Sequence, residues 1–151
     1  MSQKWTVSII LLAALGNLAW SLSARANFNG KLTVEIDGLN NNEGQVCVSI
    51  FASSQGFPND RQRVLKRQCT QISEIPLKMT FDDLKAGSYA VAVIQDLNGD
   101  GTLNRNSLGM PVEPFGFSRN PDVRTSAPKF GDAAFVLAGP NTIIQIQMKK
   151  L

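Results

Sequence analysis

Apolar and polar residues alternate along much of the chain, and this period of two predicts β-strands. Four segments carry the alternation: residues 31–36, 45–51, 77–81 and 142–148. Successive side chains of a strand point to opposite faces, so each segment should bury one face and expose the other. In the second segment, Phe51 shares the less apolar face with Cys47 and Ser49, which indicates that this face is partly covered too.

A further strand is expected at residues 89–95, where apolar residues occupy both faces. Tyr89, Val91 and Val93 would lie on one face, and the residues between them on the other. A strand that is apolar on both faces lies in the middle of a sheet and is covered on both sides. Residues 133–137 add another strand, for six or seven in all. This pattern is typical of an all-β fold, an antiparallel β-sandwich.

At most one short helix is expected, from Asn59 or Asp60, which could cap it, to about Gln68. It would carry Cys69 back toward Cys47. The four basic residues of this segment could form a functional patch, but charged residues on a helix more often form a solvated face. Residues 82–87 are expected to form a turn.

The long segment from residue 98 to about 132 shows neither the apolar period of a strand nor that of a helix. It is rich in glycine and proline but also carries Phe115, Phe117 and Phe130, so we expect it to be ordered and to fold back over one face of the sheet. The phenylalanines are expected to pin it to the core. The alternative is an exposed aromatic platform for carbohydrates or peptides.

The first 26 residues have the pattern of a secretory signal peptide. Lys4 gives a positive start, residues 7–15 are apolar apart from one serine, and Ala24 and Ala26 occupy the small-residue positions that a signal peptidase reads. The alternative is an uncleaved anchor, but the apolar run is shorter than the roughly 18–20 residues that span a bilayer. We therefore predict cleavage after Ala26, a periplasmic or secreted protein, and one mature domain over residues 27–151 with no membrane segment.

Two cysteines, Cys47 and Cys69, lie in the mature part. An even count in an exported protein favours a disulfide between them, and two separate buried thiols are the alternative. The chain has no histidine, which excludes Ser–His and Cys–His catalytic pairs and histidine metal sites.

The net charge of +3 falls when the signal peptide leaves, because Lys4 and Arg25 leave with it. The mature domain is then close to neutral, which gives no support for binding nucleic acid or an anionic membrane. The expected partner is an unidentified extracytoplasmic ligand or protein.

Residues 96–104 carry the strongest candidate site. Asp96, Asn98 and Asp100 place oxygen-bearing side chains at every second position, and Gly101 follows, as in the first half of a calcium loop. The usual glutamate near the end of such a loop is missing, so we expect weak binding with Glu113 as a substitute ligand. The predicted calcium ligands are Asp96, Asn98, Asp100, Thr102, Asn104 and Glu113. A plain turn without metal is the alternative, since Asn-Gly and Asp-Gly are strong turn dipeptides.

Several stretches resemble the DUF2141 family of exported bacterial proteins of unknown function. They are residues 56–58, 87–93, 96–101, 109–118 and 128–133. The resemblance covers nearly the whole mature chain and implies an immunoglobulin-like or transthyretin-like sandwich outside the cytoplasm, but no reaction. The chain departs from many members at Gln95, where they carry histidine, and at Pro114, where they carry glycine.

Two classes of function remain open. The first is a non-enzymatic binding or accessory domain, with calcium as its only candidate cofactor. The second is a hydrolase that uses Asp96, Asp100 and Glu113 as acid and base, although acids in an exposed glycine-rich loop have no evident cause for the split pKa values that such chemistry needs. We expect the protein not to be an enzyme.

Overall fold

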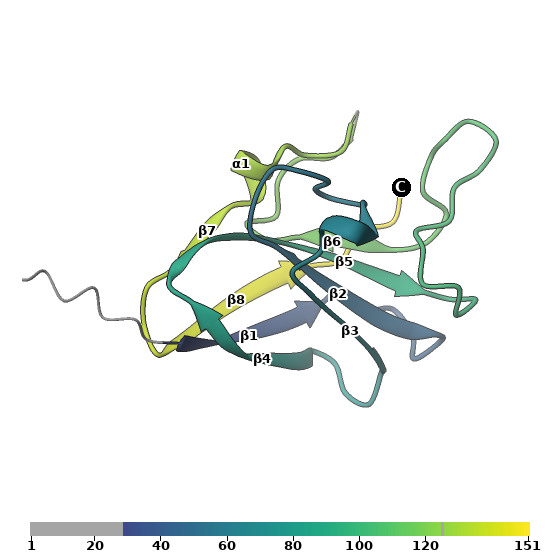
Figure 1. The fold of residues 1–151 in the computed structure, drawn as a ribbon. Coiled ribbons are helices and arrows are strands. Elements are labelled where there is room, and N and C mark those ends of the chain that lie inside the picture. Colours follow the sequence, from purple (N-terminus) through teal and green to yellow (C-terminus); the bar gives the residue numbers. More distant parts are fainter. Residues whose placement is uncertain (1–28, 125) are drawn as a thin grey trace, which may run out of the picture.

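Two β-sheets pack face to face in the computed structural model, which describes residues 29–124 and 126–151 (Figure 1). One sheet has the strand order β4–β1–β8, and the other has the order β3–β2–β5–β6, with β7 also paired to β5. The strands are β1 (Asn29–Asp37), β2 (Gln45–Phe51), β3 (Lys66–Gln71), β4 (Leu77–Lys85), β5 (Gly87–Asp96), β6 (Phe115–Phe117), β7 (Phe135–Leu137) and β8 (Asn141–Gln147). The expected signal peptide lies outside the described residues.

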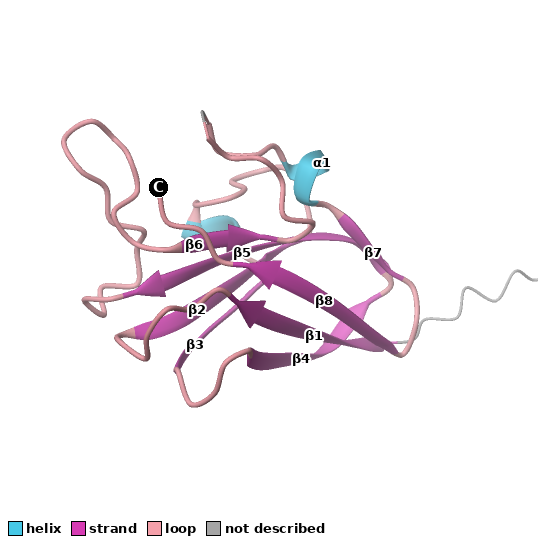
Figure 2. Cartoon of the chain, turned by 180° about the vertical axis from the view of Figure 1, so that it is seen from behind, coloured by secondary structure: helices cyan, strands magenta, loops and turns pink. Residues whose placement is uncertain are grey.

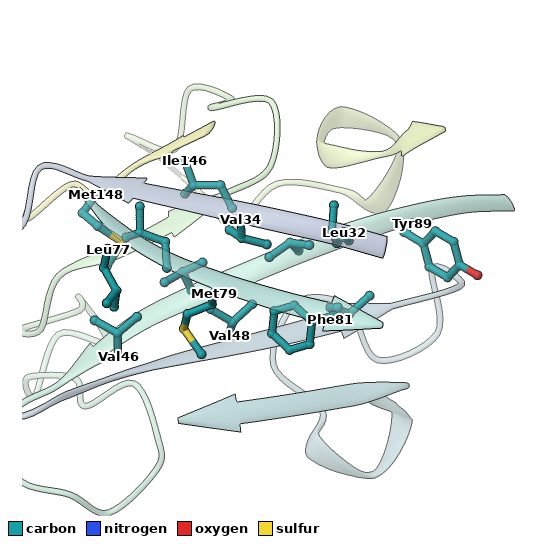
Figure 3. Packing of buried hydrophobic residues seen from close by; sticks show 14 of the residues in the cluster. Leu32, Val34, Val46, Val48, Leu77, Met79, Phe81, Tyr89, Ile146 and Met148 are labelled. Atoms are coloured by element: carbon teal, nitrogen blue, oxygen red, sulfur yellow. The ribbon is translucent and has the colours of Figure 1, made fainter. Parts of the chain in front are cut away.

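The main hydrophobic core fills the space between the two sheets (Figure 3). The alternating residues of β1, β2 and β4 point into it as the sequence predicts. Val34, Val48 and Met79, for example, are each at most 3% exposed. Burial of these apolar faces is the principal stabilising contribution to such a sandwich.

Strand β5 is buried on both faces, which confirms the expectation for a strand that is apolar on both sides. Val91 and Val93 face the main core, whereas Ala90 and Ala92 belong to a second apolar cluster on the outer face of the same sheet. The segment after β5 folds back to cover this outer face. Figure 2 shows that the long loops and the short helical turns gather on this side of the molecule.

The helix expected from residue 60 to about 68 is wrong. Asp60 does cap a helical turn, because its Oδ1 accepts a hydrogen bond from the Gln62 amide, but this turn, η1, spans only Arg61–Arg63. The chain then continues as β3, an edge strand antiparallel to β2. Pairing with β2 satisfies the backbone groups on one side of β3, and this tertiary contact overrides the helix propensity of its residues.

The sandwich is not antiparallel throughout. β8 runs parallel to β1, with Leu32 opposite Thr142 and Ile36 opposite Ile146. The turn expected at residues 82–87 is also wrong, since β4 continues to Lys85, past an irregularity in its pairing with β1. The short strand β6 and the single helical turn α1 (Phe130–Ala133) lie within the segment that carries no sequence period.

Candidate functional site

The Asp96–Asn104 segment forms a loop that is organised around the buried Asp96 carboxylate. Oδ1 of Asp96 accepts hydrogen bonds from the amides of Gly99 (2.8 Å) and Asp100 (3.2 Å). Oδ2 accepts from the Gly101 amide and from Nε2 of Gln45 on β2, both at 2.8 Å. Asp96 is fully buried, so these four donors replace the water that a carboxylate requires.

Asp100 is the second hydrogen-bonding centre of the loop. Its Oδ1 accepts from the amide and hydroxyl of Thr102, and its Oδ2 accepts from the side-chain amides of Asn98 and Asn104. Hydrogen bonds from Asn104, Thr102 and Asn98 hold the pKa of the Asp100 carboxyl well below its usual range. Asp100 is therefore ionised at any physiological pH.

Glu113 follows the hairpin around residues 105–111 and folds back onto the Asp96–Asn104 loop. Its Oε1 accepts from the Leu97 amide at 2.8 Å, and its Oε2 accepts from the Asn104 amide at 2.9 Å. One side chain, only 3% exposed, thus closes both ends of the loop.

The structure brings the six predicted calcium ligands together, but it engages their carboxylate oxygens in hydrogen bonds within the loop and to Gln45. Within residues 29–124 and 126–151, no cluster of three or more Asp, Glu, Cys or His side chains is arranged to hold a metal ion. The side-chain oxygen of Asn104, Oδ1, differs from these carboxylate oxygens, because it is buried without a hydrogen-bond partner. The loop is held by its own hydrogen bonds, and calcium binding there stays a prediction.

The phenylalanines of the long segment belong to the core. Phe115 is 4% and Phe117 is 7% exposed, while Phe130 is partly buried and packs edge-to-face against Phe57. The interpretation of these rings as core residues is confirmed, and an exposed platform built from Phe115 and Phe117 is wrong.

A cavity of about 470 Å³ lies on the outer face of the β3–β2–β5–β6 sheet. Ala92, Ile94, Phe115 and Phe117 supply an apolar floor from β5 and β6. The hairpin around residues 105–111, which projects beyond the sheets in Figure 1, supplies one wall. Arginine side chains reach the cavity from three other segments, and no aspartate or glutamate of the described chain lines it.

Arg67 is the most deeply placed of these arginines. Its Nη1 donates to Ser49 Oγ at 3.1 Å and its Nη2 donates to the Gly101 carbonyl at 2.5 Å. Burial lowers the pKa of the Arg67 guanidinium from its ordinary value, the positive charge of Arg61 lowers it further, and the negative charge of Asp96 opposes both. The Asp96–Asn104 loop therefore helps to position a cation at the edge of the cavity.

The sequence does not mark Arg67 as a site residue, because it predicts that the segment is a helix with a solvated face. A usable signal was present in the cysteines. In the antiparallel pair β2–β3, Cys47 lies opposite Cys69, and two positions along, Ser49 lies opposite Arg67 on the same face. The disulfide, with a Cα–Cα distance of 4.0 Å, confirms the predicted pairing of the cysteines. Had β3 been recognised as a strand, this register would have placed Arg67 beside Ser49.

A family model matches residues 34–145, which include most of the two-sheet fold, the Asp96–Asn104 loop and most residues around the cavity. Comparison with curated proteins and with solved structures gave no match. The matched stretch includes the Asp96–Asn104 loop, Glu113, both cysteines and Arg67. The chain belongs to DUF2141, a family described as uncharacterized protein conserved in bacteria.

Proposed function

We propose that the protein is an exported, non-enzymatic binding module that holds a small organic molecule in the cavity on the outer face of the β3–β2–β5–β6 sheet. The observation that carries the proposal is the composition of the cavity: about 470 Å³ of space over an apolar floor, with a few arginines around it. Small-molecule sites are typically concave spaces of about 300–1,000 Å³ with mostly apolar walls and a few placed polar groups.

The residues around the cavity support binding rather than catalysis. The chain has no histidine, and no carboxylate side chain of the described residues lines the cavity. The acids that a hydrolase would use, Asp96, Asp100 and Glu113, bind amide and hydroxyl donors of their own loop and Gln45. General acid–base catalysis needs a group within hydrogen-bond reach of the substrate, and none of these three acids lines the cavity.

Two observations support export. The disulfide between Cys47 and Cys69 is of a kind that persists in oxidising compartments such as the periplasm or extracellular space. The first 26 residues have the signal-peptide pattern described above. Among the described residues, no helix is long and apolar enough to cross a membrane.

Titration with anilinonaphthalene sulfonate, a fluorescent probe with an aromatic body and one anionic group, tests the binding proposal. Ile94→Trp places a large side chain in the floor of the cavity, and it should weaken binding at least about tenfold. Ile143→Trp makes the same change on β8, at a position that is 64% exposed and does not line the cavity, and it should leave binding unchanged.

The proposal fails if the probe does not bind, or if Ile94→Trp binds it as tightly as the parent. Melting temperatures show whether each variant folds. If Ile94→Trp does not fold, Thr102→Trp fills the cavity from an exposed position instead.

Calcium binding by the Asp96–Asn104 loop is a second candidate. The observation in its favour is the buried, unpartnered Oδ1 of Asn104 beside the ionised Asp100. With millimolar calcium and weak binding, linkage would raise the melting temperature by several degrees relative to EDTA, and Asp100→Ala would remove the rise. Identical melting curves of the parent in the two buffers would leave the plain, self-bonded turn as the better interpretation.

A further inference from the structure

We propose that the molecule held in the cavity carries an oxyanion head group, bound by Arg61 and Arg67 beside Gly101, and an apolar body that lies over β5 and β6. This inference rests on the proposed binding function and adds the chemical class of the ligand. Both a carboxylate and a phosphate ester present the oxygens that guanidinium groups bind, so the shared chemistry is an amphipathic organic acid.

The two guanidinium groups lie close together. A Cβ atom at Gly101 would lie 3.5 Å from both Nη1 and Nη2 of Arg61 and 3.6 Å from Nη2 of Arg67. These nitrogens are therefore no more than about 7 Å apart, a separation at which like charges repel in a partly buried site. An anion placed between the two guanidinium groups would attract both, offset their mutual repulsion and accept hydrogen bonds from both.

Arg61 and Arg67 lack the carboxylate partners that usually accompany adjacent arginines. In the part of the chain that the structure describes, neither forms a salt bridge. The charge of Asp96 raises the pKa of Arg67, but the two Asp96 oxygens already accept four hydrogen bonds from other donors. Arg67 instead donates to two neutral oxygens, which fix its direction without forming an ion pair.

The other two arginines around the cavity are held in other ways, Arg124 by an acid and Arg105 within its own hairpin. Arg124 forms an ion pair with Asp122 at 2.7 Å. Nη1 of Arg105 donates to the Gly109 carbonyl at 2.9 Å, within its own hairpin. Arg105 also forms no salt bridge among the described residues, but the two guanidinium groups that meet at Gly101 are those of Arg61 and Arg67, from η1 and β3.

Gly101 lies beside both guanidinium groups and lines the cavity. Gly101 has φ +76°, a conformation that L side chains rarely adopt, and it lines the cavity between the two guanidinium groups. Asp96 and Asp100 of the same loop do not line the cavity, and their oxygens accept hydrogen bonds from the loop itself and from Gln45. The loop thus presents a glycine to the cavity and a backbone carbonyl to Arg67.

The floor of the cavity supplies the second half of the recognition. Ile94, Phe115 and Phe117 lie on the same sheet face as Arg67 and are apolar. A ligand with an oxyanion at one end and a short hydrocarbon chain would match both regions at once, whereas a free inorganic anion would match only one.

Isothermal titration with three ligands of equal chain length tests the inference: octyl phosphate, octanoate and octanol. The anions should bind at least about tenfold more tightly than octanol, because each charge-assisted hydrogen bond adds about one to two powers of ten in affinity. Which of the two anions binds more tightly identifies the head group.

Arg61→Gln removes one guanidinium group of the pair. Arg61 is exposed, and its side chain forms no hydrogen bond with the described residues. The variant should bind the anions about tenfold more weakly and octanol with unchanged affinity. Arg63→Gln is the matched control, since it removes the same charge from the same turn but does not line the cavity. It should change binding by less than about twofold.

The inference is overturned if octanol binds as tightly as the anions, or if Arg61→Gln and Arg63→Gln behave alike. In either case, the proposed function would still stand if Ile94→Trp weakens the binding of these ligands, because binding would then still take place in the cavity. If none of the three ligands binds and the fluorescent probe does not bind either, the proposed function fails with it.

Discussion

Glu113 is the residue whose replacement tests the structural account of the Asp96–Asn104 loop most directly. Its carboxylate is 3% exposed and accepts the Leu97 and Asn104 amides at 2.8 and 2.9 Å. Glu113→Ala would leave both amides without a partner. A buried, unsatisfied donor costs about 1–3 kcal/mol, and these two are only partly buried, so we expect a loss of about 2–4 kcal/mol in the free energy of unfolding.

Glu113→Gln separates the hydrogen bonds from simple packing. The glutamine keeps the size of the side chain and one acceptor oxygen, but its NH₂ group would face the second backbone amide, donor against donor. We expect this variant to lose about 1–2 kcal/mol, between the parent and Glu113→Ala.

Urea unfolding followed by circular dichroism measures both losses. Glu74→Gln is the control, because Glu74 is exposed and such surface changes usually stay within about 0.5 kcal/mol. The reasoning is refuted if Glu113→Ala unfolds at the same urea concentration as Glu74→Gln, which would mean that water serves the two amides equally well.

Three further predictions concern the fold and its processing. Val93→Asp would place an unpaired charge in the main core, at a position that is 1% exposed. It should lower the free energy of unfolding by several kcal/mol and lower the melting temperature sharply. A melting temperature within a degree or two of the parent would contradict the two-sheet core. Replacing Cys47 and Cys69 together by alanine should cost about 3 kcal/mol in the chain-entropy account of a loop with a sequence separation of 22, and free thiols in the unreduced parent would contradict the disulfide. Mass spectrometry of the exported protein should find a chain that begins directly after Ala26, and a full-length species in the membrane fraction would contradict cleavage.

The pattern of the sequence predicted those elements whose apolar positions repeat with the period of a strand. β1, β2, β5 and β8 were expected within a few residues of where they lie, because burial of one or both faces is written directly into their alternation. The disulfide was also predictable, since two cysteines allow only one pairing. The local hydrogen bonding of the Asp96–Asn104 loop follows in part from its turn dipeptides.

The elements that the sequence did not predict are those stabilised by partners far along the chain. β3 has only one buried neighbour strand and a composition that suits a helix, so pairing with β2 decided its conformation. The parallel register of β8 on β1 joins residues more than a hundred positions apart, which no local pattern encodes. β6 has three residues, too few to show a period, and exists because β5 offers it a partner.

The candidate site shows the same division. Residue types and spacing marked the acids of the 96–104 loop, but the chain alone could not show that their oxygens would bind the loop's own amides. Nor could it show that Arg61 and Arg67, from two different elements, would meet at Gly101. Sequence determined which residues carry charge and which faces are apolar. Tertiary structure decided which charges remain unpaired and face a cavity, because that depends on distances between segments that only the packed fold brings together.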